Sequence, residues 1–119
     1  MYGLPSGFDT SRFVGRTLEQ VSFSANTVHL TFDEDVSITI ESSLAHWTGE
    51  DVDHSNRITI PVSESRLMQL VGESISSVDA SADGTLTVWF SNGHAIACYD
   101  DTPMYEAYRL RFGDEEIVV

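Results

Sequence analysis

The chain of 119 residues lacks several features that would place it in a familiar class. It has one cysteine, Cys98, so an internal disulfide is excluded, and such sparse cysteine usage is typical of a reducing cytoplasm. No apolar run approaches the roughly 20 residues that a membrane-spanning helix needs. The first residues, from Met1 to Pro5, lack the basic and apolar stretches of a signal peptide. We therefore expect a cytoplasmic protein with no membrane partner.

Positive charge is also scarce. The chain contains no lysine, and its six arginines face 19 acidic residues, which gives a net charge of −13. Such a surface repels the phosphates of DNA and RNA, so a nucleic-acid partner is excluded. The charge favours a basic protein partner through electrostatic complementarity. A well-solvated surface, or adaptation to a saline cytoplasm, explains the same composition equally well.

What the chain does contain is an internal repeat. Val14-Gly15-Arg16-Thr17-Leu18 reappears 57 positions later as Val71-Gly72-Glu73-Ser74-Ile75. The pattern Val28-x-Leu30-x-Phe32 likewise returns as Leu86-x-Val88-x-Phe90. Only the apolar residues and the Val-Gly pair recur, which is typical of a duplicated structural unit rather than a duplicated active site. We predict one domain, 1–119, made of repeat units at about 8–62 and 63–119, with the shared positions in its core.

Each repeat unit is predicted to open with a short helix and to continue in antiparallel strands. Asp9 is a candidate cap for a turn that ends at Phe13-Val14, and Ser63 for a helix over 64–70. Period-two alternation predicts about ten strands, with Asn92-Gly93 the clearest hairpin turn. The fold class is thus α+β and mostly β. We expect a pseudo-twofold sandwich or a partly open barrel built from two tandem repeats.

The two units differ on the faces that point away from the core. In the first unit this face is polar, and in the second it is apolar. The polar set is His29, Thr31, Ser37, Thr39 and Glu41, and the apolar set is Trp89, Ala95, Ala97 and Tyr99. Something must cover the apolar face. We expect the C-terminal hairpin to do so, with a partner or a second copy of the chain as alternatives.

The second half resembles a group of small uncharacterised bacterial β-rich families. The resemblance rests on Val71-Gly72-x-x-Ile75, on Asp83-Gly84 and Asn92-Gly93, and above all on the closing segment from Tyr99 to Tyr108, Tyr-Asp-Asp-x-Pro-x-Tyr-Glu-Ala-Tyr. Families of this kind often look like immunity proteins or other accessory proteins of toxin systems. The resemblance implies no catalytic residues.

Catalytic and metal-binding patterns are weak throughout. His46 and His54 flank a loop rich in acids, which makes a small metal-dependent hydrolase one hypothesis, although the spacing matches no standard metal site. Asp79-x-Ser81-x-Asp83-Gly84 opens like a calcium loop, but Phe90 stands where the twelfth-position acid belongs, so a hairpin turn is the better interpretation. Cys98 alternates onto the core face and is expected to be inert. We predict no catalytic residue, no metal and no cofactor.

An acidic and aromatic cluster is the best candidate for partner binding. Its predicted contact residues are Asp100, Asp101, Tyr105, Glu106 and Trp89. Carboxylates and tyrosines pair well with arginine- and lysine-rich surfaces. The structural alternative is that the two aspartates cap a turn while the tyrosines pack the last hairpin. The leading hypothesis is a non-enzymatic, immunity-like protein that occludes a basic partner such as a toxin domain; a structural protein that forms a homodimer is the alternative.

Overall fold

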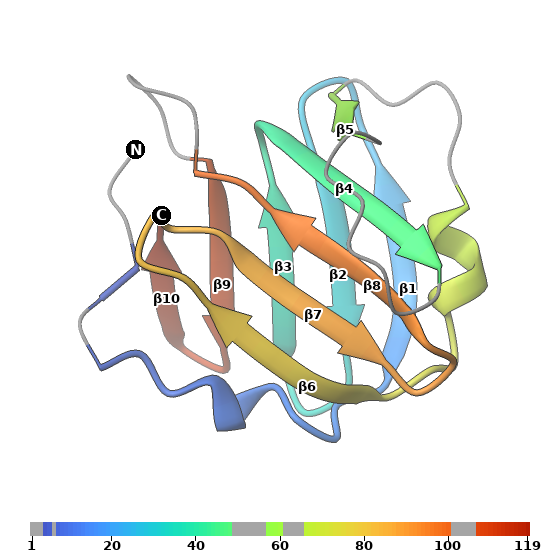
Figure 1. The fold of residues 1–119 in the computed structure, drawn as a ribbon, viewed down its shortest axis with the longest axis horizontal. Coiled ribbons are helices and arrows are strands. Elements are labelled where there is room, and N and C mark those ends of the chain that lie inside the picture. The colour runs from blue at the N-terminus through green and yellow to red at the C-terminus, as the bar shows by residue number, and fades with distance from the viewer. Residues whose placement is uncertain (1–3, 6, 49–56, 61–65, 101–106) are drawn as a thin grey trace.

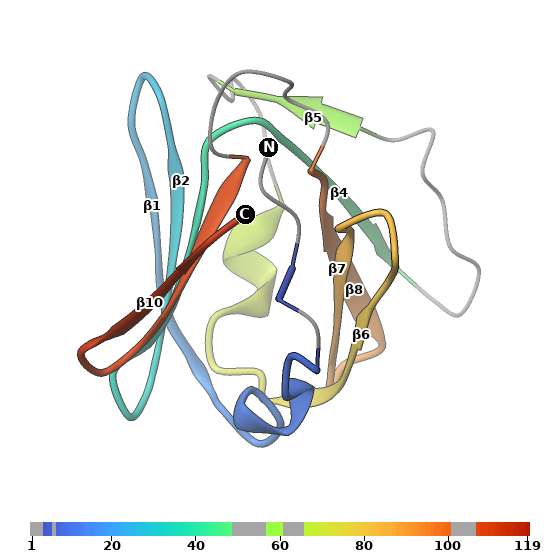
Figure 2. The ribbon, with the colours of Figure 1, turned by 90° about the vertical axis from the view of Figure 1, so that its left-hand side faces the viewer.

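The protein is a sandwich of two five-stranded antiparallel sheets (Figures 1 and 2). The computed structural model describes residues 4–5, 7–48, 57–60, 66–100 and 107–119. The first sheet has the order β1 (Leu18–Phe23), β2 (Val28–Phe32), β3 (Val36–Ile40), β9 (Tyr108–Phe112) and β10 (Glu115–Val118). The second has the order β5 (Arg57–Thr59), β4 (Ser43–Thr48), β8 (His94–Cys98), β7 (Leu86–Phe90) and β6 (Ile75–Ala80). The mostly-β prediction is confirmed.

The predicted helices are only single turns. The elements are 3₁₀ turns, η1 (Thr10–Arg12) and η2 (Leu67–Leu70), and the described residues form no α-helix. Asp9 caps η1 as predicted, because its carboxylate accepts a hydrogen bond from the Ser11 amide at 3.0 Å. The second element begins at Leu67 without a side-chain cap, and the predicted cap Ser63 lies outside the described residues. Three or four residues are too few to sustain an α-helix, so the part of the chain that the structure describes does not bear out the α part of the α+β prediction.

One core fills the space between the sheets. Inward-pointing residues of both halves form a single cluster, in which Phe32 of β2 stacks on Phe90 of β7 with ring centroids 6.4 Å apart. Side chains along β2 and β3 alternate between this core and the outside. In β2, for example, Val28, Leu30 and Phe32 are buried. The sheets stand as two separate layers (Figure 2). The fold is therefore a sandwich and not a closed barrel.

The closing hairpins of the two halves are exchanged between the sheets. Hairpins β4–β5 and β9–β10 form as the alternation predicts. However, β4 pairs with β8 of the other half, and β9 pairs with β3. The two-residue link Glu41-Ser42 carries no hairpin signal, and both of its amides donate to the carbonyl of Ala107 instead. Each sheet is thus completed by strands from the opposite half of the chain.

Positions that the sequence repeat matches touch each other across the molecule. The amide of Gly15 donates to the carbonyl of Ile75, and the amide of Gly72 donates to the carbonyl of Leu18. The hydroxyls of Thr17 and Ser74 lie 3.1 Å apart. Both glycines need positive φ, +87° and +90°, which explains why glycine stands at both positions.

The repeated valines are not in the core. Val14 and Val71, which precede these glycines, are each 45% exposed, so the prediction that every shared position is buried is wrong for them. The exposed valines lie in the turns that lead into β1 and β6.

Among the described residues, no helix is long and apolar enough to cross a membrane.

Candidate functional site

Asp100, the one acid of the predicted acidic and aromatic cluster that lies among the described residues, is buried. It is 7% exposed and packs against Gly84, where an added Cβ would lie 2.6 Å from Asp100 Oδ2. Nearby, the hydroxyl of Tyr108 donates to the Gly84 carbonyl at 2.5 Å and joins β9 to the β6–β7 turn. Burial, with Cys98, Asp100 and Asp83 as further causes, raises the pKa of Tyr108. Asp101, Tyr105 and Glu106 lie outside the described residues. Asp100 thus lies away from the surface.

The outer face of the second sheet is apolar and covered, as the sequence comparison of the two units predicts. Its buried residues are Ala45, Trp47, Ala95, Ala97 and Tyr99, with Trp89 partly buried against them. The expectation that the C-terminal hairpin covers this face is wrong. The β9–β10 hairpin instead extends the first sheet, where β9 pairs with β3. The side chains of Tyr108, Leu110 and Phe112 on β9 pack into the core between the sheets.

Cys98 and His46 point into the interior. Burial raises the pKa of the Cys98 thiol to about 12, which fits the predicted inert cysteine. His46 is 7% exposed, and its Nε2 lies 3.1 Å from Nδ1 of His94 on β8. Burial first, then the charges of His94 and Arg66, lower the pKa of His46 to about 4. His54 lies outside the described residues.

No metal centre is visible in the part of the chain that the structure describes. No three potential metal ligands gather there, and the described neighbour of the His46 ring is a second histidine, His94. The Asp79 to Gly84 segment is a hairpin turn, as predicted. Its Asp83 carboxylate accepts hydrogen bonds from the Ser81 hydroxyl and the Thr85 amide, which lowers the pKa of Asp83.

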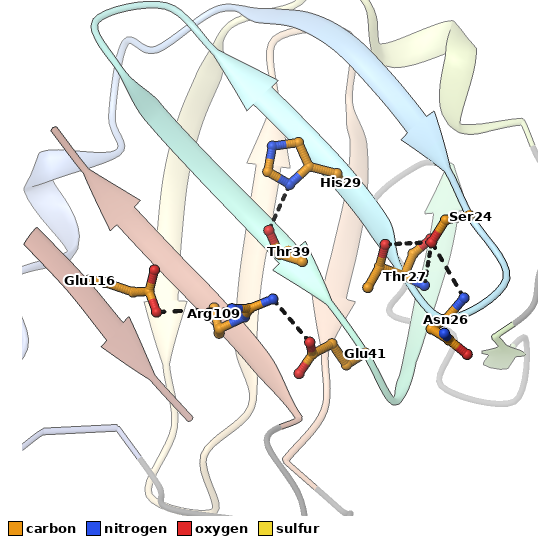
Figure 3. A network of polar contacts seen from close by, with 8 residues as sticks. All are labelled: Ser24, Asn26, Thr27, His29, Thr39, Glu41, Arg109 and Glu116. Atoms are coloured by element: carbon orange, nitrogen blue, oxygen red, sulfur yellow. Dashed lines mark hydrogen bonds and ion pairs between the residues drawn. The ribbon is translucent and has the colours of Figure 1, made fainter. Parts of the chain in front are cut away.

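The outer face of the first sheet is polar and open. Cross-strand pairing sets His29 of β2 beside Thr39 of β3, and Thr39 beside Arg109 of β9. His29 Nδ1 and Thr39 Oγ1 are 2.6 Å apart (Figure 3). Burial first, then the charge of Arg109, lower the pKa of His29. Two residues along each strand, Ser37 pairs with Arg111.

Arg109 is held between two carboxylates. Its guanidinium lies 3.0 Å from Glu41 Oε1 and 4.0 Å from Glu116 Oε1, and Figure 3 shows it flanked by both. Arg111 has no carboxylate within 4.0 Å among the described residues. This face therefore carries one neutralised and one exposed arginine in a strongly acidic protein.

Two shallow hollows lie on this face. The first measures about 290 Å³, and its lining residues are Thr27, His29, Ser37, Thr39, Arg109, Arg111 and Glu116. The second measures about 500 Å³ and is lined by His29 and Arg111 together with Glu19, Glu34, Asp35 and Asp114, among others. A hydroxyl- and arginine-lined centre thus passes into an acidic end at the β2–β3 and β9–β10 turns.

The polar face can be recognised from the sequence, but the set of residues that meet on it cannot. The alternation of Arg109 and Arg111 along β9 marked one wet face of that strand. Their neighbours could not be named, because they come from β3, which is 68 or more positions earlier in the chain. The missing information was the exchange of hairpins between the sheets.

The family of unknown function DUF6188 matches residues 9–119. No curated protein and no solved structure matches the chain.

Proposed function

We propose that this chain, which belongs to the family of unknown function DUF6188, is a non-enzymatic binding protein. In this proposal it acts like an immunity protein in the cytoplasm and occludes a basic surface of a protein partner, such as a toxin domain. The net charge of −13 supports a partner of opposite sign through electrostatic steering and complementarity. The Asp101 to Glu106 segment remains part of the predicted contact surface.

The observation that carries the proposal is an acidic end on the first sheet. The β2–β3 and β9–β10 turns lie together there, because the Gly113 amide donates to the Asp35 carbonyl at 2.9 Å. These turns expose four carboxylates, those of Glu34, Asp35, Asp114 and Glu115. Glu115 also forms an ion pair with Arg12 at 2.7 Å. Like charges held this close repel one another, and a basic partner would relieve that repulsion.

The backbone of the β2–β3 turn supports the same interpretation. Glu34 and Asp35 have φ of +59° and +58°, a left-handed conformation that side-chain-bearing residues adopt at a cost of about 1–2 kcal/mol each. The matched turn of the second half has Asn92 and Gly93, and only the glycine has positive φ there. Acidic residues thus stand where Asn-Gly would be less strained, and strained residues often serve function.

The test is capture from lysate of the source organism with immobilised protein at low and high salt. We expect a basic protein that binds at low salt and is released by high salt. The double variant Glu34→Gln/Asp114→Asn should weaken its capture about tenfold or more, since each lost contact charge is worth roughly 1 kcal/mol. Asp79→Asn, which removes an exposed charge from β6, is the matched control and should change little. Capture that is insensitive to salt, or equal for all variants, would contradict the proposal.

The two alternatives gain no supporting observation. A homodimer through the Trp89 and Tyr99 face is not needed to cover that face, because Tyr99 is 7% exposed within one chain. The hypothesis of a metal-dependent hydrolase at His46 and His54 gains no support either, because the His46 side chain points inward toward His94.

We also propose that the two halves are copies of one duplicated unit. The paired hydrogen bonds of Gly15 with Ile75 and of Gly72 with Leu18 support this proposal. The matching bulges support it as well, since β1 and β6 shift register between Leu18 and Gln20 and between Ile75 and Ser77. In that case, differences between the copies, such as the acidic turn, are where function is to be sought.

A further inference from the structure

The centre of the polar face has more hydrogen-bond donors than acceptors. Arg111 is exposed and forms no ion pair with another described residue, and Ser37 beside it uses its hydroxyl in no hydrogen bond to a described residue. Guanidinium groups only donate, so these groups call for a ligand rich in acceptor atoms.

The geometry of the groove holds the donors in place. The ion pair of Arg109 with Glu41 fixes one guanidinium on the floor of the 290 Å³ hollow. The contact of His29 Nδ1 with Thr39 Oγ1 fixes the imidazole, so that the other ring nitrogen is turned away from Thr39 (Figure 3). Arg111 lines both hollows together with His29. A ligand in the groove would therefore meet prepositioned groups, which lowers the entropic cost of binding.

We propose that this groove binds a single oxyanion, a phosphate or a carboxylate, between Arg111 and His29 over the hydroxyls of Ser37 and Thr39. An oxyanion offers only acceptors, and a planar guanidinium can bind two of its oxygens at once. The proposal stands apart from the basic partner proposed above. If both hold, the partner's surface contributes one carboxylate to the groove among its basic residues.

Charge around the groove limits what the ligand can be. Glu34, Asp35 and Asp114 line the adjoining hollow and would repel further negative groups. Glu116 lines the groove itself but pairs with Arg109 at 4.0 Å, so Arg111 is the groove charge that no described carboxylate pairs with. Acids farther away are screened beyond about 8–10 Å at physiological salt. A compact monoanionic or dianionic group fits this arrangement, whereas an extended polyanion such as RNA or DNA does not.

The test is an NMR titration of the full chain with two probes at constant ionic strength, inorganic phosphate and acetate. We expect either probe to shift the ring nitrogens of His29 and the side-chain Nε–H of Arg111 with saturation. A response to phosphate alone assigns the site to phosphoryl groups. A comparable response to acetate assigns it to carboxylates such as those of a protein partner.

Charge-matched variants separate a site from general electrostatics. Arg111→Gln should weaken binding about tenfold or more, the value of one charge-assisted hydrogen bond. Arg16→Gln is the control, because Arg16 pairs loosely with Asp33 at 3.9 Å and lines neither hollow. His29→Gln, with folding checked by amide peak dispersion, should weaken binding while leaving Arg111 responsive. Equal effects of Arg111→Gln and Arg16→Gln, or no saturable shift with either probe, would overturn the proposal.

Discussion

At the scale of single residues, Gly84 combines a positive φ with a neighbour that leaves no room for a side chain. Its φ is +90°, and a Cβ there would meet Asp100 at 2.6 to 3.1 Å. Its carbonyl also accepts the buried hydroxyl of Tyr108. The β6–β7 turn, Asp100 and β9 therefore meet at Gly84.

Gly84→Ala should lower the free energy of unfolding by about 3 kcal/mol or more, because conformational strain adds to overpacking. Gly93→Ala is the control, since Gly93 has a similar φ of +87° but nothing within 4 Å of an added Cβ. That variant should lose only about 1 kcal/mol. Urea denaturation of both variants measures the difference, and similar losses would contradict the packing argument.

A second residue, His46, makes stability depend on pH. Its pKa is about 4 in the folded protein, below its ordinary value of 6.5, because it is buried beside His94 and Arg66. The unfolded chain therefore binds this proton more tightly than the folded chain does. The stability that neutral His46 contributes is complete above about pH 6.5 and is lost as the pH falls toward 4.

His46→Gln should reduce the loss of stability between neutral pH and about pH 4 by up to roughly 3 kcal/mol relative to the parent chain. Urea denaturation at a series of pH values measures this difference. Carboxylates titrate in both proteins, so subtracting the two curves isolates His46. Parallel curves for the two proteins would show that His46 does not titrate in this way.

At the scale of elements, the β2–β3 turn holds two acidic residues in a strained backbone conformation. Glu34→Asn/Asp35→Gly places the favoured residues of a left-handed turn at positions with φ near +60°. We expect the double variant to gain about 1 kcal/mol in unfolding free energy, since the strain is relieved and part of the gain is offset by the freedom of glycine when unfolded. Thermal and urea unfolding measure the gain. Glu34→Gln, which removes one charge without relieving the strain, should stay close to the parent chain, and an equal gain there would assign the effect to charge.

Elements with a strong local signal were predicted well. The β7–β8 turn at Asn92-Gly93 and the alternating strands β2, β3 and β9 appear where the sequence places them. Of the helix predicted over 64–70, the described residues form only the single turn Leu67–Leu70, whose apolar spacing reflects packing of Leu67 and Leu70 into the core. Local patterns thus predicted where the elements lie but overestimated the helical character of the shortest ones.

At the scale of the whole molecule, the exchange of hairpins makes the two halves interdependent. Each sheet takes two strands from the other half, and residues of both halves share one core. The two outer faces then take opposite roles. That of the second sheet is buried, whereas that of the first stays open and brings His29, Arg109 and Arg111 together.

The sequence by itself determined the β-rich class, the positions of most strands and turns, the polar and apolar outer faces, and the acidity of the surface. These follow from side-chain period and composition, which act over a few residues or over the whole chain. Only the tertiary structure decided which sheet each closing hairpin joins. It also decided that Asp100 and His46 are buried, and that β9 lies beside β3. Strand pairing depends on contacts between residues far apart in the chain, and a one-dimensional pattern holds no record of which edge a hairpin will meet.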